Sequence, residues 1–203
     1  MIDKKYDMVI FGATGFTGKL ICNYISKHKD AKNLNCAIAG RNKEKLEEIS
    51  REYSVDYLLA DSFDHSSLNT MSQKAKLIIT TVGPYNIYGE NLVASCIKND
   101  AHCLDLTGEP DFVKKIYTNY NELAKNSNSI IIHSCGFESI PSDLGAYITV
   151  KKINADDIDL TYYLKTKGKI SGGTWASFLN SISSGIGSSA EKLQSSKSQK
   201  IKK

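Results

Sequence analysis

The sequence predicts an α/β fold, a Rossmann-type doubly wound parallel sheet, followed by the incomplete start of an α+β second domain. Two observations lead to this prediction. Short, nearly continuous apolar runs alternate with helix-length segments over the first 136 residues, and a glycine-rich turn follows the first apolar run. Runs this apolar suit strands that are buried on both faces, and a parallel sheet covered by helices buries its strands in that way.

Six strands are expected, one at each apolar run. Their predicted ranges are 6–12, 35–41, 55–61, 75–83, 102–108 and 129–136. Helices are expected in the intervening segments, over residues 17–28, 43–53, 65–73, 88–99 and 111–126. The turn residues agree with this register, because Gly40 and Gly83 end apolar runs and Asp111 directly follows Pro110, where a helix can start.

Three segments are expected along the chain. Residues 1–150 form the Rossmann domain, residues 151–180 begin a second domain, and residues 181–203 form a mobile tail. The second domain is inferred from a linker at 151–155 and an apolar run at 157–165, which predicts one further strand. The tail is rich in serine, glycine and lysine, a composition that cannot bury a core.

Charge and composition narrow the function classes. Lysine and arginine together number 26 against 22 acidic residues, but five of the lysines fall within residues 192–203, so the rest of the chain is close to neutral. A basic face for nucleic acid is therefore not predicted. No apolar run approaches the length of a transmembrane segment and no signal peptide is expected, so a cytoplasmic location is predicted. The spacing of the five cysteines matches neither a zinc framework nor a redox pair, and no metal site is predicted.

The glycine-rich turn GATGFTG at residues 12–18 could hold either of two kinds of phosphate. In a P-loop for nucleoside triphosphates, serine or threonine follows the lysine, and a glycine precedes it at a fixed distance. Here Leu20 follows Lys19 and Ala13 stands where the first glycine is required, so the P-loop alternative fits poorly. A dinucleotide loop needs one glycine for the sharp turn, one beside the pyrophosphate and one where the helix packs on the sheet. These are supplied by Gly12, Gly15 and Gly18.

The end of the second predicted strand distinguishes between the two nicotinamide cofactors. NAD sites place an acid there for the ribose hydroxyls, whereas NADP sites offer a cation to the 2′-phosphate. This chain has Arg41 at that position, followed by Asn42, and the guanidinium fork suits a phosphate. The sequence therefore favours NADP, while the alternative of a surface arginine paired with Glu44 or Glu48 stays open.

Two further strand ends are expected at the same edge of the sheet. Asp61 ends the third strand, where its carboxylate could reach the adenine. Gly83 and Pro84 end the fourth strand at the point where the strand order reverses, and Gly83 would let the backbone approach the cofactor. Simple loop geometry would explain these residues equally well.

Several stretches together resemble the saccharopine dehydrogenase-like oxidoreductase family, whose bacterial relatives include trans-acting enoyl reductases of glycolipid synthesis. The stretches are GATGFTG (12–18), AGRN (39–42), TTVGPYNIYGENLVASC (80–96), DLTGE (105–109), CGFESIPSDLGAY (135–147) and SGGTWAS (171–177). The resemblance implies an NADP-binding Rossmann domain followed by an α+β domain that shapes the substrate pocket and commonly pairs subunits. Family members are much longer, so the chain is expected to be C-terminally truncated relative to them.

Carried over residue by residue, the resemblance implies a set of contacts with NADP. The residues expected at the pyrophosphate are Gly12, Thr14, Gly15, Phe16 and Thr17, with Gly18 completing the turn. Arg41 and Asn42 would contact the 2′-phosphate, and Asp61 would contact the adenine. The residues expected to flank the nicotinamide half are Gly83, Pro84 and Tyr85, with residues 134–136 at the end of the sixth strand.

No catalytic residue is identified from the sequence. Candidate proton donors near the sixth strand are Cys135, Glu138, Ser139 and Asp143, although Glu138 or Asp143 could equally cap a helix that follows Pro141. Tyr147 and Lys151 have the spacing of the catalytic pair of short-chain dehydrogenases. Their place after the sixth strand does not suit that fold, and we interpret the spacing as coincidence.

The predicted function is that of an NADP-dependent oxidoreductase of the saccharopine dehydrogenase-like type, acting on a small-molecule or lipid-linked substrate in lipid or glycolipid metabolism. Two alternatives stay open: a non-catalytic NADP-binding or partner-binding protein, and a truncated gene model. By family analogy, peripheral association with lipid droplets or membranes is a further expectation. A homodimer, or another cover, is expected over the surface that an unfinished second domain would expose.

Overall fold

The structure, a computed structural model, describes residues 4–153, 157–163 and 165. The chain divides into two units between Cys135 and Gly136. The first unit holds the whole sheet and six α-helices, and the second holds one helix, α7 (Ile140–Lys152), among its described residues. The predicted tail at 181–203 lies outside the described residues.

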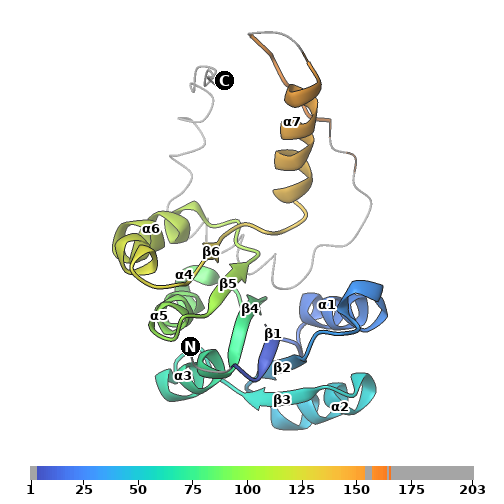
Figure 1. Ribbon diagram of the computed structural model, residues 1–203, viewed down its shortest axis with the longest axis vertical. Coiled ribbons are helices and arrows are strands. Elements are labelled where there is room, and N and C mark those ends of the chain that lie inside the picture. Colours follow the sequence, from blue (N-terminus) through green and yellow to red (C-terminus); the bar gives the residue numbers. More distant parts are fainter. Residues whose placement is uncertain (1–3, 154–156, 164, 166–203) are drawn as a thin grey trace. The chain divides into compact units, whose positions relative to one another are not determined.

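The first unit is a six-stranded parallel sheet with the strand order β3-β2-β1-β4-β5-β6 (Figure 1). The strands are β1 (Tyr6–Phe11), β2 (Cys36–Gly40), β3 (Asp56–Leu59), β4 (Ala75–Thr80), β5 (His102–Asp105) and β6 (Ile131–Ile132). The order reverses between β1 and β4, and in sheets of this kind ligands bind outside the carboxyl ends of the strands at that point. The predicted doubly wound Rossmann fold is confirmed.

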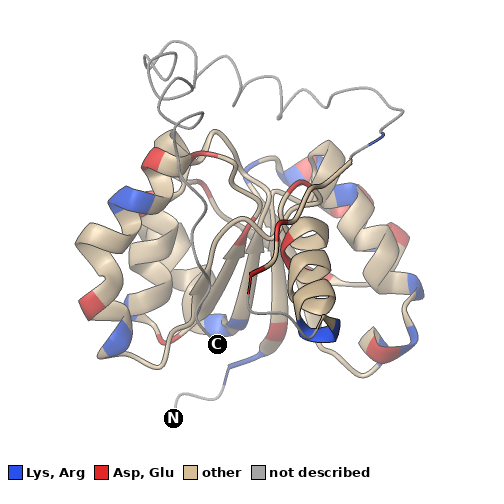
Figure 2. Ribbon diagram, turned by 90° about the horizontal axis from the view of Figure 1, so that it is seen from above, with Lys and Arg blue, Asp and Glu red and all other residues tan. Residues whose placement is uncertain are grey.

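Helices cover both faces of the sheet, and basic and acidic residues are interspersed on them (Figure 2). Those of the first unit are α1 (Phe16–Lys27), α2 (Lys43–Tyr53), α3 (His65–Lys74), α4 (Tyr85–Tyr88), α5 (Glu90–Lys98) and α6 (Pro110–Lys125), with a short 3₁₀ turn, η1, at Lys29–Ala31. Side chains of α1 and α2 pack against β1 and β2 from one face, and those of α3 and α5 pack from the other. The helices lie on two faces because every crossover is right-handed while the direction of travel changes. The chain runs from β1 outward to β3, and it then returns to β4 on the other side of β1 and continues to β6.

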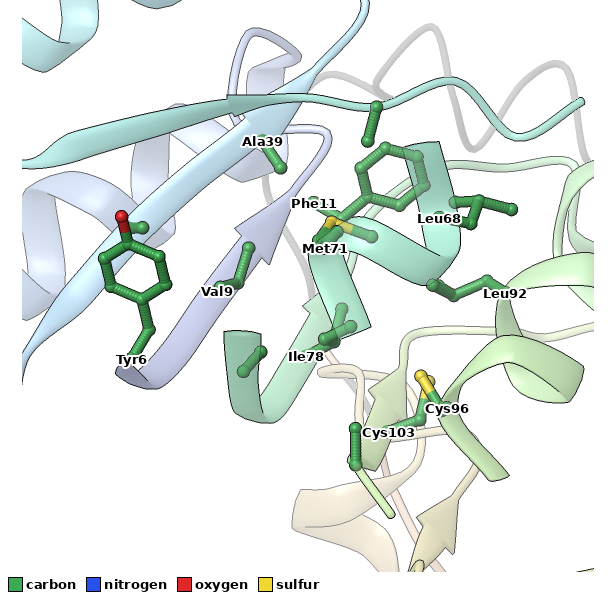
Figure 3. Close-up of a cluster of buried hydrophobic side chains, with 14 residues drawn as sticks. Tyr6, Val9, Phe11, Ala39, Leu68, Met71, Ile78, Leu92, Cys96 and Cys103 are labelled. Atoms are coloured by element: carbon green, nitrogen blue, oxygen red, sulfur yellow. The ribbon is translucent and has the colours of Figure 1, made fainter. Parts of the chain in front are cut away.

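The largest core cluster lies between the sheet and the helices α3 and α5 (Figure 3). Val9 and Phe11 of β1 and Ile78 of β4 meet Leu68 and Met71 of α3 there, and all five are at most 2% exposed. Full burial of an aliphatic or aromatic side chain of this size contributes about 1.5–3 kcal/mol each. The core thus holds β1 and β4 in register, and the ends of these two strands border the site described below.

Lys4 precedes β1 and joins three elements at the amino edge of the sheet. Its Nζ atom donates hydrogen bonds to the carbonyl oxygens of Ser72, Ala75 and Asn99, at 3.2, 2.9 and 2.6 Å. Two of these carbonyls belong to the C-terminal ends of α3 and α5, where a cation is favourable because of the helix dipole. Partial burial lowers the pKa of Lys4.

Three predicted elements differ from the structure. The helix predicted over 88–99 is preceded by a separate turn of helix, α4, because the carboxylate of Glu109 accepts the first two N–H groups of that turn. The sixth strand is limited to Ile131–Ile132. The strand predicted over 157–165 is wrong for the described residues of that range, which are irregular and include a Tyr163 side chain that is 94% exposed.

Candidate functional site

The turn after β1 is shaped by two glycines that leave no room for a side chain. Gly12 has a φ of +90°, a value that side-chain-bearing residues rarely adopt, and a Cβ atom there would lie 2.6 Å from Oγ1 of Thr81. A Cβ atom on Gly18 would overlap the carbonyl oxygen of Gly12 and lie 2.7 Å from Cα of Ala13. Gly18 therefore lets α1 pack directly on the end of β1, the task expected of the third glycine.

The N-terminus of α1 faces the same turn without a side-chain cap. Gly15 is the N-cap residue, no side chain accepts from the first turn, and that turn contains no acid. The first N–H groups of a helix carry partial positive charge and lack partners within the helix. Here they are available to an anion, as in other glycine turns that open a helix.

A cavity of about 290 Å³ runs along the carboxyl ends of β1, β2, β3 and β4. Six residues predicted to bind the cofactor line it, namely Gly12, Thr14, Gly15, Arg41, Asp61 and Gly83. Six others do not line it, namely Phe16, Thr17, Gly18, Asn42, Pro84 and Tyr85. Ser62 and Tyr88 also contribute to the wall, and the sequence analysis missed both. Polar or aromatic residues beside predicted strand ends are a general signal that could have found them.

Arg41 and Asn42 follow β2 and have different surroundings. Arg41 is exposed and forms no ion pair within the described part of the chain, so the alternative partners Glu44 and Glu48 do not hold its guanidinium. The side-chain oxygen of Asn42 accepts a hydrogen bond from the N–H of Lys45 at 2.9 Å and so caps α2. Arg41 is therefore the free cation at this strand end.

Asp61 and its neighbours form a compact turn after β3. Its Oδ1 atom accepts a hydrogen bond from the N–H of Phe63 at 2.9 Å, while its own N–H donates to Oγ of Ser67 at 3.1 Å. The second carboxylate oxygen has no partner among the described residues, and the side chain is half-buried in the cavity wall. Asp61 can thus offer an acceptor to a ligand.

The loop after β4 is held in place by hydrogen bonds to a buried carboxylate. Glu109, 1% exposed, accepts hydrogen bonds from the N–H groups of Tyr85 at 2.8 Å and Asn86 at 2.9 Å. Tyr85 is itself buried, and its hydroxyl donates to the carbonyl of Thr80 at 3.2 Å, so burial raises the pKa of this phenol. Tyr85 therefore supports the Gly83–Pro84 segment from within the core.

A second buried carboxylate, Asp105, lies at the end of β5 beside His133. Asp105 is 1% exposed, and its Oδ1 atom accepts from the N–H groups of Thr107 at 3.0 Å and Ser134 at 3.1 Å. Its Oδ2 atom lies 2.5 Å from Nδ1 of His133, the residue directly after β6. Sequence analysis did not identify this pair, whose members are 28 positions apart.

The predicted proton donors fall into two groups. Cys135 belongs to the first unit, and burial raises the pKa of its thiol. Glu138, Ser139 and Asp143 belong to the second unit, where Ser139 is the N-cap residue of α7. Tyr147 and Lys151 hydrogen bond to each other at 3.0 Å along α7. None of these six residues lines the cavity at the carboxyl ends of β1–β4.

The comparison with protein families decides the identity of the domain. Residues 8–132 match the family model described as the saccharopine dehydrogenase NADP binding domain. The chain belongs to this family. The matched range begins in β1 and ends with β6, so it contains the glycine turn, Arg41 and the two buried carboxylates.

Relatives of this NADP-binding domain include animal proteins of greater length. A saccharopine dehydrogenase-like oxidoreductase of Mus musculus is 36% identical over 194 residues, which are 86% of this chain and 45% of the mouse protein. A protein of Caenorhabditis elegans named for its localisation to lipid droplets is 36% identical over 161 residues, which are 75% of this chain and 38% of the nematode protein. The chain thus spans less than half the length of these relatives.

Among solved structures, the saccharopine dehydrogenase (L-Glu forming) of Saccharomyces cerevisiae has the same fold. The TM-score is 0.60 at 13% identity, and the match covers 72% of this chain and 31% of the yeast protein. At this level of identity the likeness concerns the fold alone. Within the described residues, no helix combines the length and apolar character needed to cross a bilayer.

The residues of this saccharopine dehydrogenase family domain fit NADP. A dinucleotide needs a close approach of backbone to pyrophosphate, and the two strained or crowded glycines of the turn provide it. The additional phosphate of NADP needs a cation at the end of β2, and Arg41 is free there. Both features border one cavity, so a single elongated ligand can contact them together.

Proposed function

We propose that this domain binds NADP(H) along the carboxyl edge of its sheet and serves an oxidoreductase reaction. The observation that carries the proposal is the glycine turn at residues 12–18, whose Gly12 and Gly18 exclude side chains beside a cavity that extends to Arg41. A P-loop would need a lysine and hydroxyl pair at the helix start, which this turn lacks. The cavity and the turn together support a dinucleotide.

Each residue of the nucleotide half has a proposed task. The uncapped N–H groups of Phe16 and Thr17 donate to the pyrophosphate, and Gly15 brings the backbone close to it. Arg41 forms a charge-assisted pair with the 2′-phosphate, while Asn42 holds the start of α2 beside it. Asp61 uses its remaining carboxylate oxygen to accept from the adenine amino group.

The nicotinamide half is proposed to lie beyond β4. Gly83 lines the cavity, and its neighbour Pro84 begins the segment that Glu109 fixes through the N–H groups of Tyr85 and Asn86. NADPH supplies the hydride in reactions of this kind, and the protein chiefly positions it and excludes water. A loop whose N–H groups are already satisfied by a buried carboxylate is suited to that positioning role.

The substrate class is proposed from the names of relatives. A relative named for its localisation to lipid droplets favours a lipid-linked compound over a small polar metabolite. The same relative motivates a test of peripheral association with lipid droplets. Both ideas rest on analogy, and neither follows from the fold.

The cofactor proposal is tested by titrating NADPH and NADH against the purified protein and the Arg41→Asp variant. Removing a charge-assisted pair and introducing repulsion is expected to weaken NADPH binding by about 10- to 100-fold, since such pairs contribute about 1.5–3 kcal/mol. NADH binding should be unchanged or improved. Arg51→Gln, at the exposed far end of α2, is the matched control and should bind NADPH normally. Tighter binding of NADH by the unmutated protein would contradict the assignment.

The enzymatic part is tested by following NADPH oxidation with a panel of imine, enoyl-lipid and ketone substrates. Turnover with any of them supports the oxidoreductase proposal. Binding of NADPH without turnover on the whole panel would favour the alternative of a non-catalytic, NADP-binding protein.

A further inference from the structure

The pair formed by Asp105 and His133 has no task in cofactor binding as proposed above. We propose that His133, oriented by Asp105, is the proton donor and acceptor of the reaction, an inference that rests on the proposed oxidoreductase function. Asp105 is the positioning residue and does not itself exchange protons with the substrate. The hydrogen bonds of the pair, the surroundings of the imidazole and its place in the fold support this role.

The hydrogen bonds of Asp105 determine which nitrogen of His133 carries a proton. Both N–H groups that reach the carboxylate from the backbone, those of Thr107 and Ser134, bind to Oδ1, and Oδ2 is left to the imidazole. A carboxylate can only accept, so Nδ1 of His133 must be the donor across the 2.5 Å contact. The neutral ring then has its lone pair on Nε2.

The Nε2 atom is free to act. No described residue hydrogen bonds to it, and it is not among buried polar atoms that lack a partner, so it reaches solvent. The His133 side chain as a whole is only 15% exposed, and its ring makes a T-shaped contact with Phe112 with 5.4 Å between ring centroids. An imidazole that is held by a hydrogen bond at Nδ1 and reaches solvent at Nε2 can exchange a proton through Nε2, as acid–base catalysis requires.

His133 borders a largely apolar cavity of about 320 Å³, which is lined by α6 and by the segment 129–133 that contains β6, with Ile97 of α5. Apolar residues from both elements line it, among them Ile116 and Ile131. The other titratable groups of the wall are Tyr117, Tyr120 and Lys125 of α6. On the sheet side the imidazole is faced by Asp105. Tyr85 and Cys135 lie near that carboxylate, and Glu109 lies near Tyr85. An apolar molecule with one polar reacting atom would fit these surroundings.

The pair lies at the carboxyl ends of β5 and β6, on the side of the sheet edge where the nicotinamide half is proposed. In reduction of a C=X bond, the carbon accepts hydride with its electron pair from NADPH, and the π pair moves to X. The imidazolium form of His133, protonated at both nitrogens, would give its Nε2 proton to X, while the hydride supplied by bound NADPH completes the C–H bond. The ring is then neutral, with its proton on Nδ1 and its lone pair on Nε2, and a solvent proton restores the imidazolium for the next turnover.

The first experiment examines the tautomer and requires no turnover. Nitrogen NMR of protein labelled with ¹⁵N-histidine should show the neutral His133 ring protonated at Nδ1. In Asp105→Asn the side-chain amide can donate to Nδ1, so the proton should move to Nε2. His102→Gln serves as the control and assists assignment, because His102 lies at the start of β5 and accepts from the N–H of Ile130 at 3.1 Å. Nε2 protonation in the unmutated protein would overturn the proposal.

The second experiment measures kinetics with NADPH and the best substrate of the panel. His133→Asn can keep the hydrogen bond to Asp105 but lacks Nε2, and it should lower kcat by about 10²- to 10⁴-fold. Any change of kcat with pH that depends on this proton donor should be absent from the same variant, since the donor is gone. Asp105→Asn should lower kcat to a similar extent, while His102→Gln should retain it.

The outcomes separate this inference from the cofactor proposal. NADPH affinity should stay within about two-fold of the unmutated protein in His133→Asn, because the residue does not line the nucleotide cavity. Normal kcat and an unchanged pH profile in that variant would overturn the role of His133 while leaving the cofactor site intact. An unmutated protein that binds NADPH but reduces nothing would also overturn it. Failure to bind NADPH at all would instead overturn the proposed function.

Discussion

The two halves of the carboxyl edge of the sheet are built in opposite ways. At the ends of β1, β2 and β3, the glycine turn excludes side chains at Gly12 and Gly18, and Arg41 is unpaired among the described residues. At the ends of β4, β5 and β6, the buried carboxylates of Asp105 and Glu109 organise the loops through hydrogen bonds to backbone N–H groups. The shape of the first half thus requires glycines without side chains, whereas the shape of the second half requires buried carboxylate side chains.

The difference suggests a division of tasks. A nucleotide can be held by amide groups and a single cation, which any glycine turn and helix start can supply. A reacting group needs side chains held in one geometry, and buried hydrogen bonds provide that rigidity. Substitutions in the two halves should therefore reduce stability or binding for different physical reasons.

The largest effect is expected from Gly18→Ala in the backbone-built half. The added Cβ atom meets the backbone of Gly12 and Ala13, so α1 must move away from β1. We expect the free energy of unfolding, from urea denaturation, to fall by about 3 kcal/mol or more, with loss of NADPH binding. Gly108→Ala is the matched control, because a Cβ atom there meets nothing within 4 Å. Equal stability of the two variants would show that α1 is not tightly packed on the turn.

A smaller effect is expected from Glu109→Gln in the half organised by side chains. A glutamine oxygen can accept from Tyr85 or Asn86, but the amide nitrogen would face the other N–H group and leave it unpaired. One buried unpaired donor costs about 1–3 kcal/mol, and urea denaturation should show a loss of that size. Glu122→Gln, on the exposed surface of α6, should change stability little. A neutral Glu109→Gln variant would mean that this carboxylate does not hold the loop.

The smallest effect concerns Asp64, an exposed carboxylate beside the nucleotide half that caps α3. Backbone N–H groups of Ser67 and Ser66 favour the charged form and lower the pKa of Asp64 in the folded state. Its contribution is therefore present above the unfolded-state pKa and is lost as the pH falls through the folded-state value. Asp64→Asn keeps a capping oxygen but cannot titrate. The difference in Tm between the two proteins should stay constant above about pH 5 and change as the pH falls below that value, because the ordinary pKa of aspartate is 3.8 and the folded-state pKa of Asp64 lies lower.

The sequence contained enough information to predict the backbone-built half. Glycine spacing and alternating apolar runs are local patterns, and the structure confirms the strand and helix series that they predict. The place of Arg41 at the carboxyl edge of the sheet could be predicted because it requires only that the residues directly before it form a strand. Predicted helix boundaries were wrong where a residue distant in the sequence determines them. The helix α4 begins at Tyr85 because Glu109, 24 positions away, accepts hydrogen bonds from its first N–H groups.

The other half was less predictable for the same reason. The hydrogen bonds of Asp105 with His133 and Ser134 join residues that are 28 and 29 positions apart, and no local pattern encodes such pairs. A signal was present nonetheless, because Asp105 ends an apolar run and an acid in such a place must find partners when it is buried. Identifying the partner required the order of the strands, which places β6 beside β5.

Lys4, far from the nucleotide cavity, has a consequence for how the domain opens. Its ammonium group is shared by the last carbonyl groups of α3 and α5 and by the first residue of β4. Loss of this one ammonium group, as in Lys4→Met, would remove a hydrogen bond from both helix ends at once, so both ends should exchange their amide hydrogens with deuterium faster in that variant.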